Sequence, residues 1–169
     1  MELKHAIAQL TANAERIKGM AEFVSQEQAQ WKPDEESWSI LETVTHLHDE
    51  EIEDFRVRLD YLLHKADEDW PPIDPIGWVA SRKYNERQLE DSLNGYLSER
   101  EKSLEWLRSL GSPDLETGKE APWGIMHAGD MLAAWVAHDL LHMRQLVEIL
   151  YAYEVENLRP YSLRYAGEW

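Results

Sequence analysis

Cysteine is absent from the 169-residue sequence, which limits both its covalent chemistry and its metal chemistry. Without thiols the chain can form no disulfide, and a metal site would have to use imidazole and carboxylate ligands. Long apolar runs are missing too, since no stretch of about 18 apolar residues could span a bilayer. The first residues also lack the basic and then apolar pattern of a signal peptide. We therefore expect a cytoplasmic protein without a membrane partner.

Basic residues are scarce relative to acidic ones. The chain has 17 lysines and arginines against 33 aspartates and glutamates, and its formal net charge is −16. A surface of this charge repels phosphate groups instead of exchanging counterions with them. We therefore expect no nucleic acid and no anionic lipid surface among the partners.

Apolar residues recur at three- and four-residue steps in four segments, which is typical of helices that bury one face. These predicted helices cover residues 2–24, 39–65, 86–110 and 128–154. Ser39 and Glu42 fit a capping box at the start of the second helix. The length suits one domain, 1–169. We predict an all-α four-helix bundle.

The connectors between these helices are rich in proline and glycine. Residues 66–77 and 111–126 cannot continue a helix, and connectors of this length permit crossovers between helices that are not adjacent. Neither connector shows the alternation of a β-strand, so we expect long crossover loops. The tail, 155–169, has no clear period and would pack across the bundle or against another subunit, and the second arrangement would give a homodimer.

Two histidines stand four residues apart in the fourth predicted helix. This spacing places the Cβ atoms of His138 and His142 on one face, about 5–6 Å apart, and Gln145 falls on the same face. Two imidazoles at this distance can share a metal ion. In an alternative interpretation, each is a core histidine bonded to a carboxylate or a backbone carbonyl. A third ligand is needed to decide.

The second predicted helix offers two candidates for that ligand, His46 and His48. At about 100° per residue, His48 falls within the apolar stripe, while His46 lies off it on the side of Glu50. Periodicity therefore favours His48, although a ligand at the edge of the stripe could border a cleft, so the choice stays open. The acidic run 49–51, including Glu50, is typical of a solvated face.

Two motifs carry a family resemblance. The segment Trp38-Ser-Ile-Leu-Glu-Thr-Val-Thr-His46-Leu-His-Asp49 resembles the second-helix motif of the DinB-like (DinB_2 type) superfamily of bacterial metal-binding four-helix-bundle proteins. The segment Trp135-Val-Ala-His138-Asp-Leu-Leu-His142-Met-Arg-Gln145 resembles its fourth-helix motif, His-Asp-x-x-His-x-x-Gln.

The resemblance implies a three-histidine metal site formed by His46, His138 and His142, which moves the preference from His48 to His46. One departure is Leu141, which stands where the family often has a further histidine. His127 stands where such proteins have a Thr or Ser helix cap, and we interpret it as structural or at most as a residue of the cleft.

Three neutral imidazoles around Zn²⁺ or Ni²⁺ leave at least one position for water, as in catalytic sites. Glu50 could then orient a ligand or move a proton, and Gln145 could hydrogen-bond to a water at the ion. The resemblance implies a divalent-metal-dependent enzyme with a small-molecule substrate, either a transferase that uses a low-molecular-weight thiol or a hydrolase. The alternative is a non-catalytic, stress-associated bundle whose histidines bind metal for stability or are merely packed.

Overall fold

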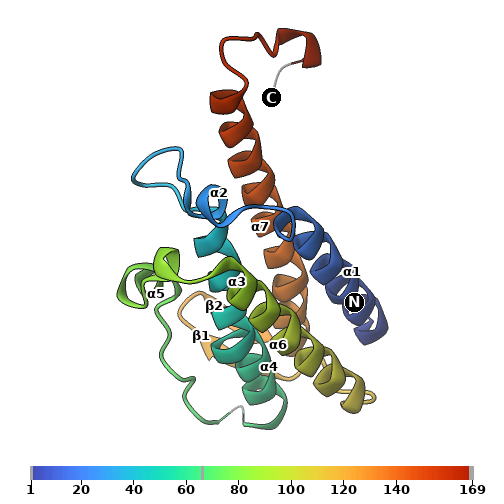
Figure 1. Cartoon of the computed structure of the whole chain (residues 1–169). Coiled ribbons are helices and arrows are strands. Elements are labelled where there is room, and N and C mark those ends of the chain that lie inside the picture. Colours follow the sequence, from blue (N-terminus) through green and yellow to red (C-terminus); the bar gives the residue numbers. More distant parts are fainter. Residues whose placement is uncertain (1, 66, 168–169) are drawn as a thin grey trace.

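Helices make up most of the computed structural model, which describes residues 2–65 and 67–167 (Figure 1). Ala66, in the predicted 66–77 loop, and residues 168–169, in the predicted tail, lie outside the described residues. The long helical arms are α1 (Leu3–Ala21), α3 (Ile40–Glu53) continued by α4 (Phe55–His64), α6 (Leu89–Ser109) and α7 (Ala128–Asn157). The shorter helices and turns are α2 (Gln26–Gln30), α5 (Pro75–Ser81), η1 (Tyr84–Glu86) and η2 (Arg164–Ala166).

The long arms form the four-helix bundle predicted from the sequence. α6 packs mainly against α3 and α1, whereas α7 packs against α1 and α4 and also contacts α3. One core cluster centres on Ile17, Val44 and Leu146, and the other centres on Leu59 and Trp135. Because both clusters join α7 to the helices around it, they fix where the polar side chains of α7 lie.

The second arm begins as predicted and then departs from the prediction. Ser39 and Glu42 form the expected capping box: each side chain accepts a hydrogen bond from the other's backbone N–H. The expected continuous helix 39–65 is interrupted at Asp54, whose φ of −118° and ψ of −90° are not helical. No glycine or proline marks this position, so the sequence gives no local signal for the break.

The predicted connectors contain more structure than loops. The 111–126 connector includes an antiparallel hairpin, β1 (Gly118–Ala121) paired with β2 (Gly124–His127), so the expectation of no strand was wrong here. Its strands are four residues each, too short for alternation to be recognised. α5 begins within the 66–77 connector, where Pro75 occupies the first turn and Asp74 caps it.

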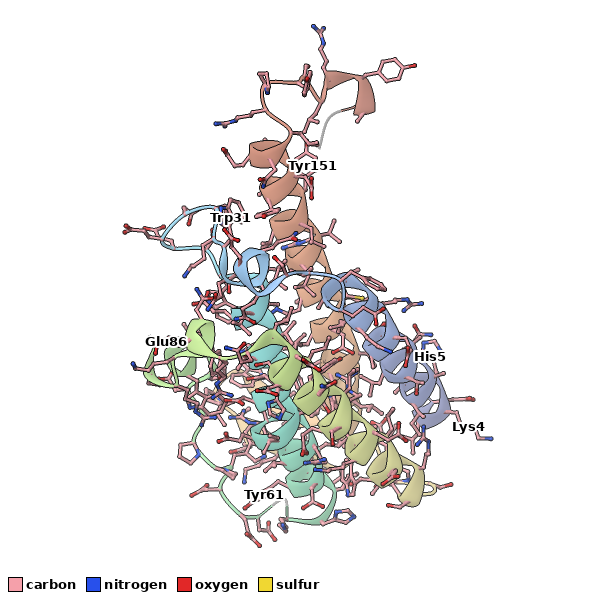
Figure 2. The ribbon with its side chains drawn as sticks, viewed as in Figure 1. Lys4, His5, Trp31, Tyr61, Glu86 and Tyr151 are labelled. Carbon is pink, nitrogen blue, oxygen red and sulfur yellow. The ribbon has the colours of Figure 1, made fainter. Side chains whose placement is uncertain are left out.

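α7 is longer than the bundle and projects beyond it at one end (Figure 1). Figure 2 places Tyr151 on this projecting part and Trp31 beside it, and the Trp31 ring makes an edge-on contact with Tyr153. In the described part of the tail, Tyr161 and Tyr165 are exposed, so that part does not pack across the bundle. Within residues 2–65 and 67–167, no helix combines the length and apolar character needed to cross a membrane.

Candidate metal centre

His46 of α3 and the two histidines of α7 meet between their helices. Ring centroids are 5.4 Å apart for His46 and His138, 4.8 Å for His46 and His142, and 4.4 Å for His138 and His142. Each ring offers one nitrogen, and these three atoms lie within 4.8 Å of one another. The structure therefore brings together the three residues that the family motif indicates.

Aromatic side chains hold the three rings in place. Trp38, just before α3, contacts His46 edge-on and stacks parallel to His142 with centroids 6.2 Å apart. Phe55, at the start of α4, contacts the ring of His138 at 4.9 Å. Because these contacts come from separate elements, the rings have little freedom to turn apart.

Burial keeps the imidazoles neutral. Desolvation, with a smaller contribution from His142, lowers the pKa of His46 to about 3. Desolvation and the two neighbouring histidines lower the pKa of His138 to about 2. The pKa of His142 is also lowered by burial, against the opposing hydrogen bond of Gln145. At neutral pH all three rings therefore offer a lone pair.

Hydrogen bonding orients His142 toward its neighbour. Its Nδ1 lies 2.8 Å from Gln145 Oε1, an acceptor, so Nδ1 carries the proton and Nε2 carries the lone pair. This Nε2 lies 3.1 Å from Nε2 of His138. In His46, Nδ1 is buried and has no hydrogen-bond partner among the described residues.

The donor set fits a divalent cation. Zinc binds imidazole nitrogen at about 2.0–2.1 Å, so nitrogens that share one ion lie up to about 4 Å apart, close to the separation seen here. Converging lone pairs on neutral rings are unfavourable unless a cation or a shared proton lies between them. Imidazole donors without thiolate suit zinc, nickel and similar ions.

His48 lies elsewhere. Its ring packs against α6 at Gly95, where a Cβ atom would come within 2.8 Å of the imidazole, so a glycine at this position makes room for it. His48 is outside the histidine cluster, and so is His5, on the exposed side of α1 (Figure 2). His127 caps α7 in a capping box with Asp130, consistent with a structural role.

The acidic run after His46 is buried, so the expectation of a solvated face was wrong. Asp49, Glu50 and Glu51 are each at most 5% exposed. Glu51 binds Arg100, the indole N–H of Trp135 and the hydroxyl of Ser103. These partners lie far along the chain, so neighbouring residues could not have indicated them.

Glu50 lies one helical turn beyond His46 and is surrounded differently from Glu51. Burial raises the pKa of its carboxyl to about 9, and the charge and hydrogen bond of Asp54 add to the rise. Glu50 therefore holds a proton at neutral pH, with Asp54 as its hydrogen-bond partner. Asp54 is in turn paired with Arg58, whose Nε lies 2.7 Å from its Oδ1.

A cavity of about 480 Å³ opens beside the histidine cluster. Its wall includes His142 and Gln145 from α7, Trp38 from the start of α3 and Ile76 from α5. Glu148 and Ile149 also line it, one turn beyond Gln145 on α7. Neither residue belongs to a recognisable motif, although helical spacing from His142 places both on the same face.

The model of one protein family, the DinB superfamily, matches residues 9–146, which include the whole histidine cluster. The solved structure of YfiT from Bacillus subtilis is similar in fold, with a TM-score of 0.75 and 19% sequence identity. The match covers 88% of this chain and 85% of that one, and YfiT is described as "a probable metal-dependent hydrolase with an unusual four-helix bundle topology". No curated protein matches the sequence.

Proposed function

Because the chain belongs to the DinB superfamily, we propose that it is a divalent-metal-dependent enzyme that acts on a small molecule and holds its metal with His46, His138 and His142. The observation that carries this proposal is the convergence of three neutral imidazoles, His46 buried and His138 and His142 half-buried, beside a cavity. A closed structural site would use four protein ligands, whereas three leave room for a substrate. Zn²⁺ and Ni²⁺ are the ions we expect.

Hydrolysis is the reaction we favour. A divalent ion in this site would lower the pKa of a water molecule and polarise a substrate carbonyl. In this proposal Gln145 keeps the His142 ring in the tautomer that directs Nε2 toward the other histidines. Glu50 holds a proton close to His46 and is the candidate acid. The description of YfiT as a probable hydrolase supports this version.

Transfer of a low-molecular-weight thiol is the second version of the proposal, and it uses the same three histidines. A thermal-melt screen of small thiols on the metal-loaded protein separates the two versions. A thiol that raises the melting temperature only when metal is present supports transfer, whereas no shift with any thiol favours hydrolysis.

The decisive experiment is metal analysis of protein purified without a histidine tag. We expect about one zinc or nickel ion per chain, and a loss of that ion in His142→Ala. Absence of a stoichiometric metal from the unmutated protein would refute the proposal and favour a non-catalytic bundle with packed histidines.

A homodimer is part of the proposal. The outer face of α7 exposes Leu140 and Leu141, about half of whose surface is open to solvent. These two exposed leucines are the feature of the surface that supports this part of the proposal. Light scattering of the purified protein would measure the mass, and a monomer at all concentrations would exclude the dimer. A cytoplasmic location stays a prediction.

A further inference from the structure

The cavity beside the histidines has a carboxylate at its far end. Along α7, His142, Gln145 and Glu148 follow one another at three-residue steps and all line the cavity. Six residues of helix correspond to about 9 Å, and a helical side chain leans back toward the N-terminus. A small ligand that reaches His142 with one end would therefore bring its other end near the Glu148 carboxylate.

A second carboxylate borders the same cavity from another element. Glu36, in the segment between α2 and α3, lines it, and Asp34 and Glu35 beside it are exposed. No lysine or arginine is among the described residues that line this cavity. The charge facing a ligand at this end is therefore negative.

The cations closest in sequence are already paired. Arg144 lies 3.4 Å from Glu148 in an exposed contact, and Lys32 lies 3.3 Å from Glu42. An exposed ion pair of this kind contributes little free energy, so a ligand cation can displace Arg144 from Glu148.

The wall between the two ends is apolar and partly aromatic. Trp38, Ile76 and Ile149 supply it, and the face of an indole ring attracts cations. A volume of about 480 Å³ is within the usual range of small-molecule sites.

We propose that the substrate is a small molecule with an electron-pair donor at one end, a compact apolar body and a protonated amine at the other. The assignment of the electron-pair donor depends on the proposed function, because this end of the substrate would bind the metal held by the histidines. The amine end rests on Glu36, Glu148 and Trp38. An anionic ligand of the same size is disfavoured by both carboxylates and by the net charge of −16.

The test uses matched thiols, because a thiol binds zinc whichever reaction the enzyme performs. Isothermal titration of the zinc-loaded protein compares ω-aminothiols, cysteamine and its longer homologues, with ω-mercaptocarboxylates of equal methylene count. Uncharged mercaptoalcohols serve as the reference. We expect the best aminothiol to bind about tenfold more tightly than its matched carboxylate, with the preference falling at high salt.

Two double variants locate the source of the preference. In Glu36→Gln/Glu148→Gln, the aminothiol and its matched mercaptocarboxylate should bind with nearly equal affinity. The zinc content of this variant should be unchanged. Glu15→Gln/Glu105→Gln removes the same charge from exposed positions on α1 and α6 and should leave the ratio unchanged. Equal affinity for both thiols, or a preference that survives in the first variant, would overturn the proposal.

Failure of the metal assignment gives a different result. If the protein holds no zinc, the comparison is made with phenethylamine and phenylpropionate, which need no metal. An amine preference that depends on Glu36 and Glu148 then supports the cavity proposal while the proposed function fails. Absence of the preference in this comparison overturns the cavity proposal as well.

Discussion

Two polar clusters meet at α7, where His138 belongs to one and its neighbour Asp139 to the other, and their chemistry differs. Arg100 bonds both oxygens of Asp139 at 2.8 Å and also bonds Glu51 and the carbonyl of Leu10. In this cluster one guanidinium is paired with two carboxylates, which also accept hydrogen bonds from Asn13, Ser103 and Trp135. In the neighbouring histidine cluster, three neutral rings bring their nitrogens within 4.8 Å of one another, and the described residues supply no opposite charge among them.

The two clusters contribute differently, one to the stability of the fold and the other to ligand binding. A buried charge that is fully paired keeps a fold together and offers nothing to a ligand. A cluster of neutral nitrogens that are only partly hydrogen-bonded costs free energy, and a protein retains such a cluster where a ligand completes it. Arg100, Glu51 and Asp139 therefore serve the fold, whereas the histidines are free for the proposed metal site.

The largest expected effect is on the paired cluster. Arg100→Met should lower the free energy of unfolding by about 3–5 kcal/mol, because Glu51 and Asp139 would remain buried without a counter-charge. Urea denaturation followed by circular dichroism measures the change. Arg108→Met breaks an exposed pair with Glu101 and should cost less than about 1 kcal/mol. Similar losses in both variants would mean that the buried network does not stabilise the fold.

The next effect distinguishes His46 from His48. A metal present at about 1,000 times its dissociation constant stabilises a protein by about 4 kcal/mol. We expect this stabilisation in the unmutated protein and in His48→Ala, whereas it should disappear in His46→Ala. Thermal melts with and without zinc or nickel measure it. If zinc or nickel stabilised His46→Ala as much as the unmutated protein, His46 would not be a metal ligand.

The third prediction concerns the proton on Glu50, which lies on α3 between His46 of one cluster and Glu51 of the other. Its pKa is raised from the model-peptide value of 4.5 to about 9 in the folded protein. Its contribution to stability is therefore complete below about pH 4.5 and is lost as the pH rises toward 9. At pH 7 this loss is on the order of 3 kcal/mol, so the metal-free Glu50→Gln variant should be the more stable protein there.

Urea titrations of that variant and of the unmutated protein at several pH values measure the effect. The exposed variant Glu105→Gln should follow the pH profile of the unmutated protein. If Glu50→Gln follows it too, Glu50 does not hold the proton. A more stable but less active variant would support the role of Glu50 as the acid.

The smallest effect concerns Gln145. Gln145→Ala removes the acceptor that fixes the tautomer of His142, and metal affinity should fall about tenfold. Competition with a chromogenic chelator measures the dissociation constant. Arg144→Ala changes an exposed neighbour on the same helix and should leave it unchanged. An unchanged affinity in Gln145→Ala would show that the aromatic contacts alone orient the ring.

The bundle was predictable because its signals are local. Helical periodicity and the capping box of Ser39 and Glu42 depend on residues within a few positions of each other, and the structure follows both. The hairpin and the break at Asp54 carry no such signal, since the strands are short and no glycine or proline marks the break.

The site was predictable only in part, and α3 explains why. Periodicity favoured His48 because it assumes a single apolar stripe, but residues 40–47 of α3 are all buried. A helix that is buried on nearly all sides has no boundary between an apolar and a polar face. Periodicity therefore cannot decide which histidine faces α7. The family motif indicated His46 instead, and the structure places it in the cluster. The burial of Glu50 and Glu51 depends on α6 and α7, which no local pattern reveals.

The adjacency of His138 and Asp139 on α7 has a consequence for mutation. A shift of α7 by one residue would turn its side chains by about 100°, which would separate Asp139 from Arg100 and His138 from His46 at once. A substitution that moves this helix would therefore destabilise the fold and open the histidine cluster at the same time. Glu36 and Glu148, by contrast, are exposed and do not pack in the core. Substitutions at these two positions could therefore change the proposed substrate preference without affecting the fold.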